Sequence, residues 1–351
     1  MTAPGQAADR RPIGLVALST FIRAVAVAGG MSPANAERIC DVYVRATLRG
    51  VGHHDVHDLP ERVASWRSGA INPDPDIRKL GGEAALEGYD GDNGAGELCA
   101  SFVLDRAGEL ARRYGIGLCT IRHSNHFLSA APYAERAAEQ GLLSIVLSRS
   151  KPVMGMPGYG RRLIGNSPLG FATLAGDAHP LLLDICLAYS SFGNLKDLAE
   201  AGRTIPPSWG GDDAGRPTVD PSVITSSGVS YPIGEHKGFG LGLLVEILTG
   251  GLAQGAVADA TNSDHPDGNG VHSQTAIAIR PDALMPAEAY RAKVSELVDR
   301  VERAAPGIRM PGASSFAKKQ RSLGLRTVEL RPAFFEQANR LARELGVAEL
   351  H

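Results

Sequence analysis

Residues 98–147 read LCASFVLDRAGELARRYGIGLCTIRHSNHFLSAAPYAERAAEQGLLSIVL, and two helix-then-strand units follow one another in this stretch. In the first unit, apolar residues recur along 98–114 at the spacing of a helix packed on one side. The glycines of Gly115-Ile116-Gly117 end that helix, and residues 118–121 form an apolar run typical of a strand.

The second unit repeats this order. Residues 130–140 are alanine-rich and predict a helix, Gly141 ends it, and residues 142–147 predict another strand. Helices therefore alternate with strands, and the stretch predicts an α/β fold.

The rest of the chain extends this pattern toward both ends. Ser32-Pro33 predicts an N-cap and a first helical residue for a helix over 34–48. The almost continuous apolar run 181–187 is typical of a central strand covered on both faces. Further predicted elements are a strand over 275–279, helices over 286–305 and 332–345, and a long ordered loop over 202–228.

Composition excludes several classes of protein. The chain has 351 residues and a net charge of -2, so it lacks the basic field that nucleic acid or an anionic membrane would require. Its N-terminus has no signal-peptide pattern, and residues 239–260 predict a buried helix and turn and not a membrane span. Four cysteines far apart in sequence indicate reduced thiols and a cytoplasmic location.

The segment His53-His54-Asp55-Val56-His57-Asp58 is the densest set of groups that transfer protons or bind metals. His53, Asp55 and His57 alternate as they would on one face of a strand, and their ligand atoms would suit zinc or iron. Alternatively, one histidine serves as an acid or base for a substrate oxygen. A solvated polar loop after the preceding helix is the third interpretation, and all three stay open on spacing alone.

Two further segments suggest an anion site. Residues 124–127 follow a predicted strand and precede a helix, so the helix N-terminus would bind a dinucleotide phosphate, or Ser124 or Asn125 would cap it. Residues 236–242 contain glycines, but they lack the third glycine and the preceding strand of a Rossmann fingerprint. Lys237 is either a phosphate ligand or an exposed lysine.

Taken together, these segments resemble the malate/L-lactate dehydrogenase-like family, which is unrelated to the Rossmann lactate dehydrogenases and includes sulfolactate and ureidoglycolate dehydrogenases and Δ1-piperideine-2-carboxylate reductase. The resemblance covers nearly the whole chain. The matching segments, in order, are residues 49–51, 124–127, 165–168, 183–184, 205–206, 215–221, 232–241 and 310–312.

The resemblance implies a non-Rossmann NAD(P)-binding, mainly antiparallel sheet flanked by helices, with a helical domain formed by both chain termini. We expect residues 1–75 and 286–351 to form the helical, dimerisation and active-site domain, and residues 76–285 to form the NAD(P)-binding domain. It also implies a homodimer with the active site near the subunit interface, and NAD or NADP as the cofactor.

Site residues follow from matching positions. His54 matches the family's histidine that exchanges a proton with the substrate. Asn166 falls where the family often has a substrate-contacting threonine, with Phe192 and Gly193 near the same pocket. The positions expected to contact the cofactor are His126, Phe127, Leu128, Ser129, Ala130, Ser150, Asp184, Ile185, Cys186, Lys237 and Gly312.

Two departures from the family pattern concern the substrate. Asp58 stands where the family has the arginine that clamps a substrate carboxylate, and an aspartate repels such a group. We therefore expect a substrate that is rich in hydroxyls or carries a cation, and not a simple 2-oxo acid. The serine that orients the catalytic histidine is also missing, so His53 or Asp55 is expected to take its role.

The first hypothesis is thus an NAD(P)-dependent dehydrogenase or reductase of a ketone or imine, without a metal. Alternatives are a binding protein on the same scaffold, a 2-hydroxy acid dehydrogenase that anchors its carboxylate elsewhere, and a metal-dependent hydrolase.

Overall fold

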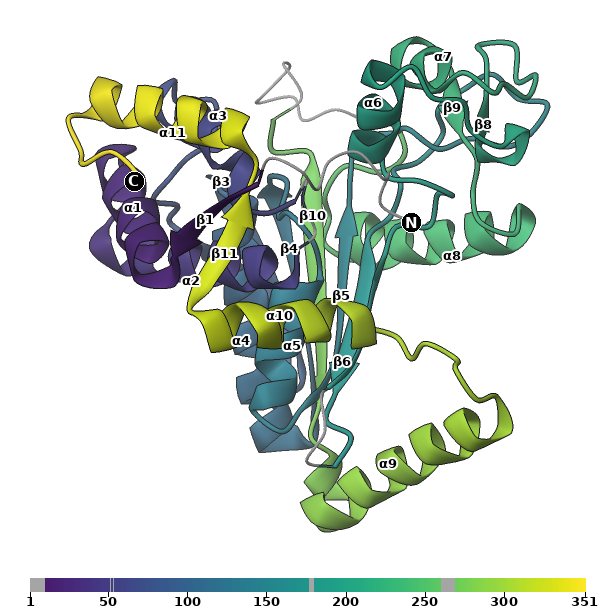
Figure 1. Cartoon of the computed structure of the whole chain (residues 1–351). Helices are drawn as coiled ribbons and strands as arrows, with labels where there is room; N and C mark the ends of the chain where they lie inside the picture. The colour runs from purple at the N-terminus through teal and green to yellow at the C-terminus, as the bar shows by residue number, and fades with distance from the viewer. Residues whose placement is uncertain (1–9, 51, 53, 177–179, 260–268) are drawn as a thin grey trace. The chain divides into compact units, whose positions relative to one another are not determined.

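The structure is a computed structural model, which describes residues 10–50, 52, 54–176, 180–259 and 269–351. The chain divides into two compact units (Figure 1). Residues up to Asp74 and from Arg309 onward form the terminal unit, and Pro75–Ile308 forms the central unit. The sequence-based prediction instead assigns residues 286–308 to the domain formed by the chain termini.

The terminal unit is mainly helical and is built from both ends of the chain. Strand β1 pairs antiparallel with β11, which joins Arg11 to Leu330 and Gly14 to Thr327. Its elements are β1 (Arg11–Gly14), α1 (Leu15–Ala28), α2 (Pro33–Arg49), η1 (Val56–Asp58), α3 (Leu59–Arg67), α10 (Ala313–Leu325), β11 (Thr327–Leu330) and α11 (Pro332–Leu345).

Helix α2 begins and ends where its sequence predicts. The Ser32 hydroxyl accepts a hydrogen bond from the Asn35 N–H at 3.4 Å, and Pro33 occupies the first turn. Gly50 ends the helix in the left-handed region, with φ of 65°, which costs a glycine little. This sharp end turns the chain directly into the histidine cluster.

A seven-stranded sheet forms the core of the central unit, in the order β2-β3-β4-β10-β5-β6-β7. Only the β3–β4 pair is parallel, so the predicted mainly antiparallel sheet is confirmed. The strands are β2 (Arg78–Glu83), β3 (Leu86–Gly94), β4 (Ile116–Ser124), β5 (Leu143–Arg149), β6 (Leu169–Thr173), β7 (Leu181–Ile185) and β10 (His272–Ile279).

Helices cover both faces of this sheet. A Cβ at Gly117 of β4 would lie 2.2 Å from the Ala107 carbonyl oxygen, so helix α4 (Gly96–Tyr114) packs closely on that face. Thr275 of β10 points to the other face, where its hydroxyl donates to the Leu248 carbonyl at 2.8 Å. That residue belongs to the π-helical turn η3 (Ile247–Gly251), which follows α8 (His236–Glu246).

The remaining elements of the central unit are short, apart from α9 (Ala287–Ala304). The predicted loop 202–228 contains a short helix and a two-residue strand, and its Ile205 and Ile224 form a small core with Leu195. These elements are α5 (Ala131–Glu139), α6 (Phe192–Glu200), η2 (Pro207–Trp209), β8 (Gly210–Gly211), α7 (Pro221–Ser226), β9 (Val229–Ser230), η4 (Pro281–Ala283) and α9 (Ala287–Ala304).

Two expectations from the sequence are wrong. Residues 181–185 of the apolar run 181–187 form β7, which is an edge strand and not a central one. Ile185 at the end of β7 and the following Cys186 pack on a hydrophobic cluster around Leu147 and Leu187. An apolar strand sequence can therefore reflect packing of its side chains on one cluster, without a neighbouring strand on each side.

The second wrong expectation is that residues 239–260 form a buried helix. Leu241, Leu244 and Ile247 are 46%, 50% and 62% exposed, so α8 and η3 pack on the sheet with one side only. Among the described residues, no helix is both long and apolar enough to cross a membrane.

Candidate active site

The predicted site residues fall into two groups, one in each unit. In the terminal unit, the histidine cluster lies in the turn between α2 and α3, and its last three residues form the 3-10 turn η1. The prediction that Asp55 and His57 lie on one face of a strand is therefore wrong, because His57 lies in a 3-10 turn. His53 itself lies outside the described residues.

Asp55 and His57 hold this turn together. The imidazole Nδ1 of His57 lies 2.6 Å from one carboxylate oxygen of Asp55, and the Gly52 N–H donates to the other at 2.9 Å. The Arg331 N–H donates to Nε2 of His57 at 3.3 Å, and its guanidinium donates to the Gly52 carbonyl at 2.8 Å. Because Nε2 accepts, the proton of a neutral His57 lies on Nδ1 and faces Asp55.

This network decides what Asp55 and His57 are available for. Both ring nitrogens of His57 have protein partners, so neither lone pair is directed at a metal ion. Burial by itself raises the pKa of the Asp55 carboxyl, but the bonds from His57 and Gly52 outweigh it and lower that pKa below its usual value. Asp55 is thus an ionised structural group whose described partners are His57 and Gly52, not His54.

His54 and Asp58 form a second pair in the same turn. Nδ1 of His54 lies 3.6 Å from Oδ2 of Asp58, and the two side chains are 26% and 27% exposed. Both groups are thus accessible while their neighbours are fixed.

Gly312 is connected to the same turn through α10. It precedes that helix with φ of 83°, and its carbonyl accepts from the Ser315 hydroxyl at 3.0 Å. The buried Arg49, at the end of α2, donates to this hydroxyl at 2.8 Å. The predicted cofactor contact at Gly312 is therefore fixed to the helix that precedes the histidine cluster.

In the central unit, strand direction gathers the other predicted residues at one end of the sheet. Strands β4, β5 and β7 run the same way, because the pairs that link them through β10 and β6 are all antiparallel. Ser124 pairs with His272 and Arg149 with the adjacent Ser273, so the ends of β4 and β5 are level. The loops after these strands and before β6 consequently share one edge.

The loop after β4 carries His126 to Ala130. The side chains of Phe127, Leu128 and Ala130 are buried, so they offer a ligand only main-chain atoms. Leu128 has φ of 69°, an uncommon conformation for a residue with a Cβ and one often found at functional sites. A Cβ at Gly170 would lie 2.4 Å from the Ala130 Cβ, so this loop crosses close over β6.

The start of α5 is capped from a distant strand. Asp184 of β7 accepts from the N–H groups of Ala130 and Ala131 at 3.3 Å and 3.1 Å. Asp184, and not Ser124 or Asn125, therefore caps this helix, and its carboxylate satisfies amides that a phosphate would need. Asn125 instead binds main-chain oxygens of Asn93 and Gly94 in the interior.

Ser150 and Asn166 lie together beside this loop edge. The Ser150 hydroxyl donates to the Asn166 side-chain oxygen at 2.9 Å. The Asn166 carbonyl accepts from the Leu187 N–H at 2.8 Å, which places it beside the chain that leaves β7. A predicted cofactor contact and a predicted substrate contact are thus in direct contact.

Ile185 and Cys186 lie at the end of β7, half-buried against the core. Burial raises the pKa of the Cys186 thiol to about 11, so it is protonated at neutral pH. The chain just before α8 is bound to the segment that follows β7, because the Ile233 N–H donates to the Leu187 carbonyl at 2.8 Å. Lys237 follows four residues after Ile233. Lys237 is exposed in the first turn of that helix.

Phe192 and Gly193 begin α6, where the Ser191 hydroxyl accepts from the Asn194 N–H at 3.2 Å. The guanidinium of Arg162 lies 5.7 Å from the Phe192 ring and donates to main-chain carbonyls of Gly228 and Ile224. These contacts make Arg162 a structural residue that connects the start of α6 to α7 and the residue before β9.

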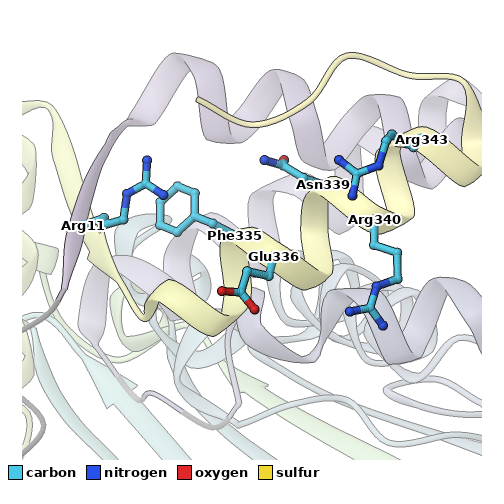
Figure 2. Close-up of a pocket in the computed structure, with 6 residues that line it drawn as sticks. All are labelled: Arg11, Phe335, Glu336, Asn339, Arg340 and Arg343. Carbon is cyan, nitrogen blue, oxygen red and sulfur yellow. The ribbon is translucent and has the colours of Figure 1, made fainter.

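A surface pocket of about 310 Å³ in the terminal unit contains none of the predicted residues (Figure 2). Arg11 stacks over Phe335 at 4.6 Å, Arg343 pairs with Glu349 at 2.9 Å, and Asn339 binds the main chain of Leu350. These side chains connect α11 to Arg11 of β1 and to the residues that follow α11. The pocket is completed by Glu336 and Arg340.

Sequence reasoning missed the residues that support the cluster from a distance. Arg331 is 279 positions from Gly52 and carried no signal beyond preceding a predicted helix. Thr47, whose hydroxyl accepts from the Val56 N–H at 3.2 Å, looked like an ordinary helix residue.

Known proteins resemble this chain over most of its length. The sequence profile of the family described as Malate/L-lactate dehydrogenase matches residues 13–337. The chain is 29% identical over 325 residues to L-sulfolactate dehydrogenase of Methanocaldococcus jannaschii, covering 91% of this chain and 92% of the relative. It is 32% identical over 301 residues to 2,3-diketo-L-gulonate reductase of Escherichia coli, covering 84% and 90%.

Solved structures agree. The M. jannaschii sulfolactate dehydrogenase has a TM-score of 0.87 at 27% identity, covering 96% of this chain and 98% of its own. Δ1-piperideine-2-carboxylate reductase of Pseudomonas syringae has a TM-score of 0.86 at 26% identity, covering 95% and 100%. The chain therefore belongs to the malate/L-lactate dehydrogenase family and is an oxidoreductase acting on CH–OH or related groups.

Proposed function

We propose that this protein transfers hydride between a nicotinamide dinucleotide, NAD or NADP, and the carbon of a ketone or secondary alcohol, or of an imine or amine. His54 is the group that exchanges the proton with the substrate oxygen or nitrogen. The observation that carries this proposal is the turn between α2 and α3, which presents a partly exposed His54 while hydrogen bonds fix Asp55 and His57.

The residues at the sheet edge fit a dinucleotide in part. When bound, the nicotinamide would supply or accept the hydride. Main-chain groups of the 126–130 loop, Ser150 and residues 184–186 would hold it, with the exposed Lys237 as a phosphate ligand at a helix start. The first amides of α5 do not fit a phosphate, because Asp184 already accepts their hydrogen bonds.

For the substrate, we propose a carbonyl compound that bears hydroxyls or a cation, and not a simple 2-oxo acid. Asp58 supports this, since its carboxylate lies beside His54 and would repel a carboxylate bound there. Asn166 and Phe192 would contact the rest of the substrate.

The assembly we propose is a homodimer. Leu241, Leu244, Ile247 and Leu252 give α8 and the following turn an exposed apolar face. A second copy would bury the same face, as in a symmetric dimer. A cytoplasmic location is proposed with it, supported by the free thiols of the four cysteines.

Binding and turnover test this function separately. NADH and NADPH are titrated by nicotinamide fluorescence, and hydroxyketones, amino ketones, cyclic imines and 2-oxo acids are then screened for loss of nicotinamide absorbance. We expect micromolar binding of one cofactor and turnover of a hydroxyl-bearing or cationic carbonyl compound. Turnover confined to 2-oxo acids would show that the carboxylate is anchored elsewhere, and binding without any turnover would contradict the proposed activity.

A further inference from the structure

Asp58 has a different environment from the other acidic residue of the turn. It occupies the N-cap position of α3, yet its side chain makes no capping hydrogen bond to that helix. Asp55, by contrast, caps η1 by accepting from the His57 N–H at 3.1 Å. The Asp58 carboxylate is thus not engaged by the start of its own helix.

What the carboxylate faces is the imidazole of His54. The two residues are four positions apart, and Oδ2 of Asp58 lies 3.6 Å from Nδ1 of His54. That nitrogen is buried, although the side chain as a whole is about a quarter exposed. The distance is that of an ion pair and slightly exceeds a hydrogen bond, and catalytic hydrogen bonds are often long before a ligand binds.

A carboxylate at this place selects one form of the imidazole. It accepts but does not donate when ionised, so it favours the neutral tautomer with the proton on Nδ1. The lone pair then lies on Nε2, the nitrogen on the far side of the ring. The negative charge also stabilises the imidazolium that forms when Nε2 takes a proton.

We propose that Asp58 is the positioning residue of His54, holding Nδ1–H toward its carboxylate so that Nε2 exchanges the proton with the substrate. This inference rests on the proposed function. In the oxidative direction, Nε2 would take the proton of the substrate hydroxyl while the carbon that bears this hydroxyl would give its hydride to a bound oxidised nicotinamide, so that C–OH becomes C=O. The imidazolium then loses its proton to water.

Hydrogen bonds in the turn hold the main chain around His54 and Asp58 in place. Arg331, His57 and Asp55 hold the chain on both sides of His54, and Asp58 N–H donates to the Asp55 carbonyl at 3.0 Å. The spacing between His54 and Asp58 is therefore set by the main chain.

Asp58→Asn tests the proposal, because asparagine is a good N-cap and removes the charge with little change of shape. We expect kcat to fall about 10- to 100-fold, the range seen for carboxylates that orient metal-binding imidazoles, with cofactor affinity nearly unchanged. Asp58→Glu should recover part of kcat. Glu61→Gln is the matched control, since Glu61 is exposed in the first turn of the same helix, and it should leave kcat unchanged.

A double-mutant cycle separates positioning from a structural role. In a His54→Ala background, Asp58→Asn should cause no further loss, because the group that it orients is gone. Equal losses in both backgrounds, or a rise in KM at constant kcat, would overturn the proposal in favour of a structural or substrate-binding role.

Nitrogen-15 NMR of histidine-labelled protein at alkaline pH gives a readout independent of turnover. His54 should carry its proton on Nδ1 in the unaltered protein and shift toward Nε2 in Asp58→Asn. A tautomer on Nε2 in the unaltered protein would overturn the positioning role even if the enzyme is active. A tautomer on Nδ1 together with an inactive enzyme would instead contradict only the proposed function.

Discussion

His54 and His57 differ in chemical availability although they are three residues apart. His57 is almost fully enclosed, with Asp55 on one nitrogen and the Arg331 N–H on the other, and its ring packs edge-on against Phe334 at 5.2 Å. His54 faces Asp58 and is partly exposed. Local hydrogen bonding, and not residue type, thus assigns one histidine to structure and the other to proposed chemistry.

The charge at residue 58 should set substrate preference. Asp58→Arg replaces a repulsive group by a two-pronged carboxylate ligand, so the ratio of kcat/KM for a 2-oxo acid to that for a hydroxyketone should rise at least about tenfold. A loss of His54 orientation should lower kcat/KM for both substrates by the same factor, so its effect cancels in the ratio. Glu61→Arg makes the same charge change one turn away and should leave the ratio unchanged; a rise there, or none in Asp58→Arg, would argue against the proposed preference.

At the scale of elements, close approach between the 126–130 loop and β6 should control both stability and cofactor affinity. Gly170→Ala places a methyl group 2.4 Å from the Ala130 Cβ, and relieving that clash should cost about 1–3 kcal/mol of unfolding free energy and weaken cofactor binding. Urea denaturation and fluorescence titration measure the two effects.

The matched control is Gly88→Ala in β3 of the same sheet. Its added Cβ would meet only a methyl group of Thr120, at 3.8 Å. It should change stability by less than about 1 kcal/mol and leave cofactor affinity unchanged. Equal effects at the two glycines would show that strand propensity, and not the loop, explains the loss.

Three elements of the central unit are joined by one carboxylate, that of Glu87 on β3. Arg106 of α4 donates to it at 2.5 Å and 3.0 Å, Lys79 of β2 at 2.6 Å, and the Tyr89 hydroxyl at 2.5 Å. The bond from Arg106 lowers the pKa of Glu87 most; burial opposes it, and Lys79 and Tyr89 lower it further, to well below its usual range.

Because the folded pKa lies below the unfolded value of about 4.3, this stabilisation is present above pH 4.3 and is lost as pH falls toward the folded value. Glu87→Gln should be less stable by about 2 kcal/mol at pH 7, with the difference shrinking below pH 4. Urea unfolding at pH 7, 4 and 3 measures it. The exposed Glu83→Gln on β2 should show no such convergence, and a difference for Glu87→Gln that is independent of pH would contradict this account.

Sequence predicted the elements whose signals are local. Helix α2 was predictable from Ser32, Pro33 and Gly50, and helix α11 from Pro332 and Gly346, because caps and glycine stops act within one turn. The position of β7 in the sheet was not predictable, since an apolar sequence does not determine which strands pair with it. Nor was the Asp184 cap of α5, which depends on a strand 53 residues away.

The candidate site shows the same division. Family resemblance placed His54, and the antiparallel sheet then explains why Ser150, Asn166 and Asp184 share an edge. The contact between Ser150 and Asn166, and that between Asp58 and His54, depend on side-chain distances that no sequence spacing fixes.

At the scale of the whole molecule, the proposed dimer depends on the apolar face of α8. Leu244→Asp puts a charge on that face and should convert the dimer to monomer at micromolar concentration, as measured by sedimentation velocity. Leu284→Asp is the control, because Leu284 is 84% exposed outside this face, and it should remain dimeric. A Leu244→Asp protein that stays dimeric would place the interface elsewhere.

The central claim is that His54 exchanges the substrate proton in a hydride-transfer reaction. The most direct measurement is a single turnover of the reduced nicotinamide by the best carbonyl substrate, followed by stopped-flow absorbance for the unaltered protein and His54→Ala, with cofactor affinity titrated for both. The account predicts that His54→Ala loses at least about 100-fold in the rate of nicotinamide oxidation while binding the cofactor with nearly the same affinity. Oxidation at an unchanged rate in His54→Ala would contradict it.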